Sequence, residues 1–249
     1  MAEKSNVRRV AGVLRALGLD PESADERAVR CVRGIEVDAG TARACRANLR
    51  AIHPSGGGRS IVRGDALLDA GLVPDGAFDL VVGNPPFLSQ LAASTARTRD
   101  DADRLRARFG SAVGPYTDPA AVFLLRSLEA ARPDGGVVAL IEPLAVLSAR
   151  DARGVRARVL ADSSLTALWV AEEPVFDADV EVGAPVLVRG GAGGAAAATS
   201  IVRGRSFSSG PTVASPDASD ASWSSLLAAL QDLPERVLGS DGVLGDLAA

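Results

Sequence analysis

The sequence has few of the residues from which nucleophilic and metal-dependent active sites are built. Its 249 residues include one histidine, His53, and two cysteines, Cys31 and Cys45. His53 stands beside Pro54 in a Gly-rich segment typical of a loop, which argues against a Ser-His-Asp triad or a His-rich zinc site. The cysteines fall in a predicted strand and a predicted helix, with too few partners for a disulfide or metal site. We therefore expect a reduced, cytoplasmic protein without a metal.

Long apolar runs and an excess of positive charge are also missing. No run reaches the roughly 18 apolar residues of a membrane span. Glu3, Lys4 and two arginines precede any apolar run, unlike a signal peptide, so we expect no membrane partner. The net charge of −4 argues against tight nucleic-acid binding by the chain alone, although a separate recognition domain could supply that binding. With 47% hydrophobic residues, a sizeable core is possible although only 4% are aromatic.

Apolar periodicity predicts strands that alternate with helices. A polar loop is expected at 20–27, and an insertion at 88–118 contains a charged, exposed helix. Helices are expected at 6–18, 40–50, 119–132, 148–160 and 222–233, and strands at 29–38, 59–65, 78–84, 136–143, 165–173 and 184–190. The segment 199–207 is a further possible strand. This alternation predicts an α/β protein with a mostly parallel sheet covered by helices on both faces.

Polar residues gather where the predicted strands end. Ligands of such sheets bind outside the carboxyl ends of the strands. Those ends carry Glu36 and Asp38, then Asp65, then the Asn-Pro-Pro run at 84–86, and finally Glu142 before a proline. A structural interpretation stays open for each residue, because Asp and Asn also favour strand-to-helix turns. Asp38, for example, equally suits an N-cap of the helix that follows.

The segment FDLVVGNPPF at 78–87 resembles the catalytic motif of amino-methyltransferases that act on planar nitrogens. The resemblance implies a Rossmann-like class I fold and S-adenosylmethionine as methyl donor. It assigns catalysis to Asn84, Pro85, Pro86 and Phe87. The Asn84 side-chain oxygen and the Pro85 carbonyl would each accept an amine hydrogen, freeing the lone pair for methylation. The prolines lock the turn, and Phe87 would stack on a base rotated out of the duplex.

Two further segments resemble the cofactor-binding motifs of the same enzymes. In GIEVD at 34–38, Glu36 and, after it, Asp38 match the carboxylate that binds the ribose hydroxyls. In GDAL at 64–67, Asp65 matches the acceptor of the cofactor's adenine amine, and Ala66 could contact the adenine ring. Asn84 is assigned to the cofactor site as well as to the acceptor site.

Further segments resemble one group of these enzymes, the N6-adenine DNA methyltransferases of restriction-modification systems. They are the segment around Tyr116-Thr117-Asp118, and PVFD and VGAPVLV after residue 173. The resemblance covers about residues 7–190. The expected partner is double-stranded DNA with a flipped adenine, with a separate specificity or endonuclease subunit as an option. Alternatives are a methyltransferase for rRNA, a protein glutamine or cytosine N4, and a catalytically inactive remnant. The arginines of the insertion could meet DNA phosphates, but interleaved aspartates favour a solvated helix.

One family element is absent: the strand that ends in an Asp-x-x-x-Gly-x-Gly turn. We therefore expect an N-terminally incomplete catalytic domain at 1–190 that binds S-adenosylmethionine weakly. Without that central strand, the sheet should be open between the strands that end at Asp38 and Asn84. A low-complexity linker and a helix at 191–249 would begin a downstream region.

Overall fold

The computed structural model describes residues 2–52, 60–69, 71–87, 99–176, 180–190, 198–204, 210–217, 219–220 and 222–231. The predicted loop position of His53 lies outside these ranges, as does the first part of the insertion, which includes Arg97. Within these ranges, none of the helices combines the length and the apolar character of a membrane span.

The N-terminal part forms a small unit with its own core. It comprises α1 (Ala2–Ala16), α2 (Pro21–Cys31), β1 (Gly34–Glu36), α3 (Ala39–Ile52) and β2 (Ile61–Arg63). The two strands pair in parallel, as expected for a strand–helix–strand connection. Val7 of α1, Ala28 of α2, Leu49 of α3 and Ile61 of β2 lie in one buried cluster, so each of the three helices contributes to this core.

Two predictions for this unit were wrong. The expected polar loop at 20–27 is helix α2, and the strand expected from residue 29 begins only at Gly34, which places Cys31 at a helix end. The Asp20 side chain accepts from the Ser23 amide at 3.0 Å and caps the helix, while Pro21 suits its first turn. Ala24 and Ala28, one turn apart, are fully buried, a contact made by small residues that the polar composition concealed.

The pattern of α1 was also predicted only in part. Val7 is buried as expected, but Val13 and Leu17 remain 60% and 74% exposed. Ala11 takes a place in the core instead. The apolar residues of this segment therefore cover more of the helix circumference than α2 and α3 bury.

The larger sheet contains the remaining strands, in the order β3-β4-β7-β6-β8-β9 with β5 beside β7. Their bounds are β3 (Leu80–Gly83), β4 (Val137–Leu140), β5 (Glu142–Pro143), β6 (Ser163–Ala171), β7 (Val182–Arg189), β8 (Ala198–Gly204) and β9 (Thr212–Ala214). β3 is parallel to β4, and β6 to β8, whereas β7 runs antiparallel to β4 and β6. The strands expected at 165–173 and 184–190 thus correspond to β6 and β7, which form an antiparallel hairpin, and the possible strand expected at 199–207 corresponds to β8.

Helices pack on this sheet around the main core. They are α4 (Arg99–Phe109), α5 (Pro119–Ala130), α6 (Ala145–Ser148), α7 (Arg153–Asp162) and α8 (Ser224–Gln231), with 3-10 turns at Gly110–Ala112 and Arg150–Ala152. Trp223 and Leu226 are fully buried in the same core, and the Trp223 amide donates to the Leu147 carbonyl at 2.8 Å. The described residues after 190 therefore pack as part of this unit, with no change of packing at that position.

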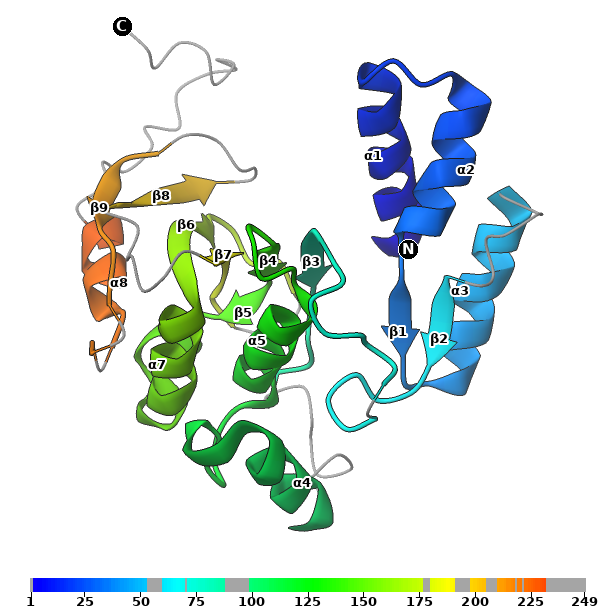
Figure 1. Ribbon diagram of the computed structural model, residues 1–249. Coiled ribbons are helices and arrows are strands. Elements are labelled where there is room, and N and C mark those ends of the chain that lie inside the picture. Colours follow the sequence, from blue (N-terminus) through cyan, green and yellow to red (C-terminus); the bar gives the residue numbers. More distant parts are fainter. Residues whose placement is uncertain are drawn as a thin grey trace, which may run out of the picture.

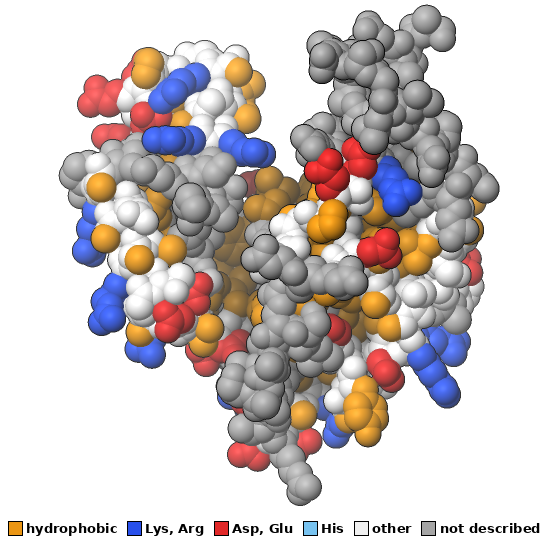
Figure 2. Space-filling view, turned by 180° about the vertical axis from the view of Figure 1, so that it is seen from behind, with side chains coloured by type: hydrophobic (Ala, Val, Ile, Leu, Met, Phe, Trp, Pro, Cys, Tyr) orange, Lys and Arg blue, Asp and Glu red, His pale blue; other side chains and the backbone are white. Residues whose placement is uncertain are grey.

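The expected break in the sheet is present. Among the described strands, β1 pairs with β2 alone and β3 with β4 alone. Figure 1 shows the unit of α1–α3, β1 and β2 standing apart from the larger sheet, and Figure 2 shows a hollow with hydrophobic side chains between the two. Leu80 and Val82 of β3 are 56% and 49% exposed, unusual for apolar residues of a strand. An apolar face at β3 is thus left uncovered.

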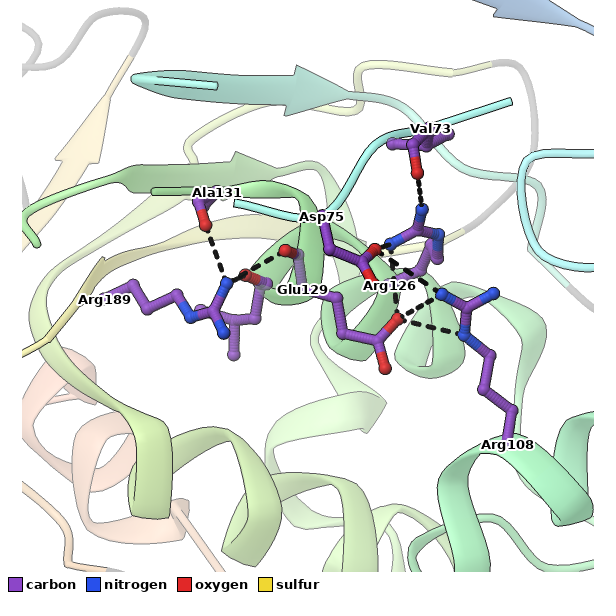
Figure 3. A network of polar contacts seen from close by, with 8 residues as sticks. Val73, Asp75, Arg108, Arg126, Glu129, Ala131 and Arg189 are labelled. Carbon is purple, nitrogen blue, oxygen red and sulfur yellow. Dashed lines mark hydrogen bonds and ion pairs between the residues drawn. The ribbon is translucent and has the colours of Figure 1, made fainter. Parts of the chain in front are cut away.

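A polar network fixes the segment that leads into β3 (Figure 3). Arg126 of α5 is 4% exposed; it donates to the Asp75 carboxylate at 2.8 Å and to the Val73 carbonyl. Glu129 accepts from Arg126 at 3.2 Å and from Arg108 of α4 at 2.7 Å. Charge-assisted bonds of this kind are strong when the donor is buried. They attach residues 73–75 to the sheet-covering helix, and so hold the start of β3 in place.

Arg189 of β7 completes the end of α5. Its guanidinium donates to the carbonyls of Leu128, Glu129 and Ala131, at 2.7 to 2.9 Å. Carbonyls in the last turn of a helix lack intrahelical partners, so a cation there satisfies them and meets the favourable end of the helix dipole. The hairpin strand β7 is thereby tied to the helix that precedes β4.

Candidate active site

The predicted catalytic motif lies at the end of β3. The apolar residues 80–83 form a parallel ladder with β4, and its last bond runs from the Ile141 amide to the Gly83 carbonyl at 2.9 Å. Proline has no amide hydrogen, so Pro85 and Pro86 cannot extend the ladder. Asn84 is consequently exposed at the carboxyl end of the strand, Pro85 is buried beneath it and Pro86 is exposed. A side-chain amide is available at the position where such sheets bind ligands.

Phe87 anchors the turn in the protein. Its side chain is 2% exposed and packs in a cluster with Ala120 of α5 and Val182 of β7. The ring of Phe176 meets it edge-on, with 5.8 Å between centroids and 82° between planes. In this conformation the ring that the sequence assigned to base stacking is buried and in contact with Phe176. A base could stack on Phe87 only after neighbouring side chains move.

Glu36 and Asp65 lie together at the ends of the paired strands β1 and β2. Glu36 stands opposite Arg63, and the Gly64 amide donates to the Glu36 carbonyl at 3.1 Å. One Glu36 carboxylate oxygen accepts from the Asp38 amide at 2.9 Å, and one Asp65 oxygen accepts from the Leu67 amide at 2.8 Å. The other oxygen of each carboxylate takes no part in these local bonds. The sheet thus presents two neighbouring hydrogen-bond acceptors at this edge.

Asp38 has the structural role that the sequence left open. Its side chain accepts from the Thr41 amide at 2.7 Å and forms the N-terminal cap of α3. The hydrogen bonds from the backbone and side chain of Thr41 lower the pKa of Asp38 below its usual value. Ala66 lies in the turn after Asp65 and is half-buried.

These residues fit the groups that the resemblance assigns to them. Ribose hydroxyls and an adenine amine are hydrogen-bond donors, and Glu36 and Asp65 each have a carboxylate oxygen outside the local bonds given above that could accept them. Strand pairing places Glu36 opposite Arg63, two residues before Asp65, but among the described strands no pairing joins β1 to β3, which leads to Asn84. The cofactor-side carboxylates and the acceptor-side turn therefore belong to two separate sheets.

Glu142 is the one strongly perturbed acid near the turn. It follows β4, is 1% exposed, and within the described part of the chain neither carboxyl oxygen has a hydrogen-bond partner. Burial raises the pKa of Glu142 well above its ordinary value, and the negative charge of Asp118 at the start of α5 raises it further. The sequence marked Glu142 only as a polar strand end, because burial of its side chain depends on α5 and β7.

The charged helix of the insertion is α4, as predicted. Arg104 pairs with Asp101 at 3.8 Å and Arg106 with Asp103 at 3.5 Å, both within the helix. Arginines engaged with aspartates one turn away form a solvated, nearly neutral surface rather than a basic patch. The preferred interpretation of this segment is therefore supported by its ion pairs.

Comparison with known proteins gives a family match over the region that contains both sets of residues. The profile of the N-6 DNA methylase family matches residues 16–188, more than half of the chain. A search of curated proteins finds no significant match.

Solved structures show the same fold at low sequence identity. The chain is similar to the M protein of the type I restriction enzyme EcoKI, with 21% identity, a TM-score of 0.57, and coverage of 81% of this chain and 42% of that one. It is also similar to a type I restriction-modification methyltransferase subunit from Streptococcus thermophilus, with 18% identity, a TM-score of 0.54, and coverage of 90% of this chain and 46% of that one. A third similar structure is a putative class I S-adenosylmethionine-dependent methyltransferase from Listeria monocytogenes, with 13% identity, a TM-score of 0.51, and coverage of 80% of this chain and 53% of that one. The chain thus has the predicted class I fold and spans about half the length of these proteins or less.

Proposed function

The chain belongs to the N-6 DNA methylase family, and on that premise we propose that it transfers a methyl group to the N6 amine of adenine in DNA. The observation that carries this proposal is the exposed Asn84 on the Pro-locked turn that ends β3. S-adenosylmethionine would supply the methyl group as an electrophilic sulfonium.

The acceptor turn is suited to an amine on a planar ring. Such an amine is a weak nucleophile, because its lone pair is conjugated with the ring. The Asn84 side-chain oxygen and the Pro85 carbonyl can accept its two hydrogens, which favours a pyramidal nitrogen with a directed lone pair. Because the turn is fixed by two prolines and by the buried Phe87, these acceptors are oriented before the substrate arrives.

The cofactor side would be held by the carboxylates of the smaller sheet. Glu36 is suited to accept from the ribose hydroxyls and Asp65 from the adenine amine, since each has an oxygen outside its local bonds. Asp38 contributes indirectly in this proposal, because its capping of α3 fixes the backbone that follows Glu36. Ala66 would border the adenine ring.

The expected partner is duplex DNA from which the target adenine is rotated outward. Catalysis on an exocyclic amine inside a base pair requires this rotation, because the amine otherwise faces the opposite base. Arg104 and Arg106 of α4 pair with aspartates of the same helix and Arg108 pairs with Glu129, so we place DNA affinity on a separate specificity subunit or domain. Cytoplasmic location in a restriction-modification system follows from the same proposal.

The proposal is tested by methyl incorporation with the full chain. Duplex DNA, rRNA and a release factor are incubated with tritiated S-adenosylmethionine, and the DNA product is analysed for N6-methyladenine by mass spectrometry. We expect N6-methyladenine in DNA alone, and its loss in Asn84→Ala. Arg106→Ala, on the exposed face of α4, is the matched control and should retain activity. Label in rRNA or protein instead of DNA would overturn the acceptor, and absence of label from all three would overturn the activity.

A further inference from the structure

Glu142 is a buried acid that the proposed reaction does not use. Its side chain is 1% exposed, and neither carboxyl oxygen finds a hydrogen-bond partner among the described residues. Proteins rarely keep such a group, because burial without a partner costs free energy that an apolar residue would avoid. A carboxyl group retained under these conditions points to a partner that arrives with a ligand.

The position of Glu142 is level with the acceptor turn. The Ile141 amide donates to the Gly83 carbonyl at 2.9 Å, so Asn84 and Glu142 each lie one residue beyond the same hydrogen bond. Pro143 stands opposite Val182 in the β5–β7 pair. Ile141 and Val182 belong to the cluster that surrounds Phe87. Glu142 itself stands opposite Gly183, so the residue before it in the chain, Ile141, and the residue before its cross-strand partner, Val182, both belong to the cluster on which the turn packs.

The surroundings of Glu142 favour the neutral form of its carboxyl group. Burial and, after it, the charge of Asp118 raise the pKa of Glu142. Glu181, which precedes Val182 of the β5–β7 pair, is an acid but is exposed. A neutral carboxylic acid has a hydroxyl donor and a carbonyl acceptor, whereas a carboxylate can only accept. Glu142 therefore adds a donor to a site where Asn84 and Pro85 offer acceptors.

We propose that Glu142 is a specificity-determining residue of the acceptor site, where its hydroxyl donates to an unprotonated ring nitrogen beside the target amine. This inference rests on the proposed function, because it takes the substrate to be adenine, whose N1 and N7 flank the amine and only accept. Asn84 and Pro85 accept from the amine, and Glu142 distinguishes a ring with a nitrogen beside the amine from a ring without one. Replacement of a ring nitrogen by C–H would leave the Glu142 hydroxyl without a partner, which such a site rejects.

Access of a base to Glu142 requires one rearrangement. Phe87 is as deeply buried as Glu142, and the half-buried Phe176 lies against its ring at nearly a right angle. Phe176 packs on the same cluster as Ile141 and Val182. The proposal therefore requires side chains of this cluster to move before a planar base can reach Glu142.

The inference is tested by binding of small bases to the full chain. Dissociation constants are measured by NMR titration for 9-methyladenine and its 1-deaza and 7-deaza analogues, with excess S-adenosylhomocysteine present to occupy the cofactor site. The wild type should bind one analogue about tenfold more weakly than 9-methyladenine, equivalent to about 1.4 kcal/mol. Glu142→Leu should bind that analogue and 9-methyladenine equally, whereas Glu142→Gln, whose amide still donates, should retain discrimination. Glu181→Gln is the matched control and should behave as wild type.

Three results would overturn the inference: equal binding of the three bases by the wild type, undiminished discrimination by Glu142→Leu, or no binding of 9-methyladenine. If Glu142→Leu fails to fold, the comparison of Glu142→Gln with wild type still decides, because a structural role predicts no dependence on the ring nitrogen. Discrimination between the bases together with absence of DNA methylation would count against the proposed function alone.

Discussion

Replacement of Glu142 by glutamine should make the protein more stable, by an amount that grows with pH. Glutamine has nearly the same size and is neutral at every pH, so the comparison isolates ionisation of the acid. Glu142 is 1% exposed and without a hydrogen-bond partner among the described residues, and its pKa in the folded protein is raised well above the ordinary 4.5. Above the ordinary pKa the unfolded chain therefore loses a proton that the folded chain keeps.

The size of the effect follows from proton linkage. Where the folded state binds one proton more than the unfolded state, the free energy of unfolding falls by about 1.4 kcal/mol per pH unit. From about pH 5 upward the wild type should thus lose stability relative to Glu142→Gln at up to this rate. The loss ends where the folded carboxyl group itself ionises. Below the ordinary pKa both states are protonated, and the two proteins should differ little.

Urea denaturation at a series of pH values measures this difference directly. The exposed Glu181 supplies the control, because Glu181→Gln should run parallel to wild type throughout. Parallel curves for wild type and Glu142→Gln from about pH 5 to pH 7 would refute the reasoning. They would mean that the carboxyl group titrates normally in the folded protein, and hence that it has a charge-stabilising partner.

The other predictions concern the cofactor side, the turn and the polar network. Glu36→Gln should weaken binding of S-adenosylmethionine by about tenfold in calorimetry, because one hydrogen bond to a charged acceptor is lost, and should leave the melting temperature unchanged. An unchanged affinity would show that Glu36 does not bind the cofactor. Phe87→Ala should lower the free energy of unfolding by about 3 kcal/mol, because this ring is 2% exposed, whereas a residue that served only for stacking on a base would leave stability unchanged. Arg126→Met should cost about 3 kcal/mol in urea denaturation, since it leaves Asp75 and the Val73 carbonyl without their buried donor; Arg106→Met on exposed α4 is its control and should cost almost nothing.

The hairpin and the motif strand could be predicted from sequence because their signals are local. The run Phe78 to Asn84 is apolar and β-branched, and it ends at prolines that cannot continue a ladder, so both its type and its boundary follow from neighbouring residues. The β6–β7 pair likewise shows two long β-branched segments. Prediction succeeded where residues adjacent in the chain decide the conformation.

Helix α2 and the burial of Glu142 could not be predicted for the opposite reason. In α2 the buried contacts come from Ala24, Ala28 and Val29, and small residues give a weak apolar period among the charged ones. Glu142 follows an apolar strand, and a charged residue there suggests an exposed end. It is buried because β5 pairs with β7 about forty residues later in the chain, and because α5 starts beside it. Such long-range contacts leave no local trace.

The two separate cores bear on how donor and acceptor would meet. Glu36 and Asp65 depend on the cluster of Val7, Leu49 and Ile61, whereas the acceptor turn depends on the cluster around Phe87. Strand pairing fixes positions within each sheet to fractions of an ångström, but among the described strands none pairs β1 with β3. Methyl transfer requires the reacting atoms to be held about 3 Å apart. The placement of the two sheets relative to each other is therefore the part of the proposed reaction that neither set of residues provides alone.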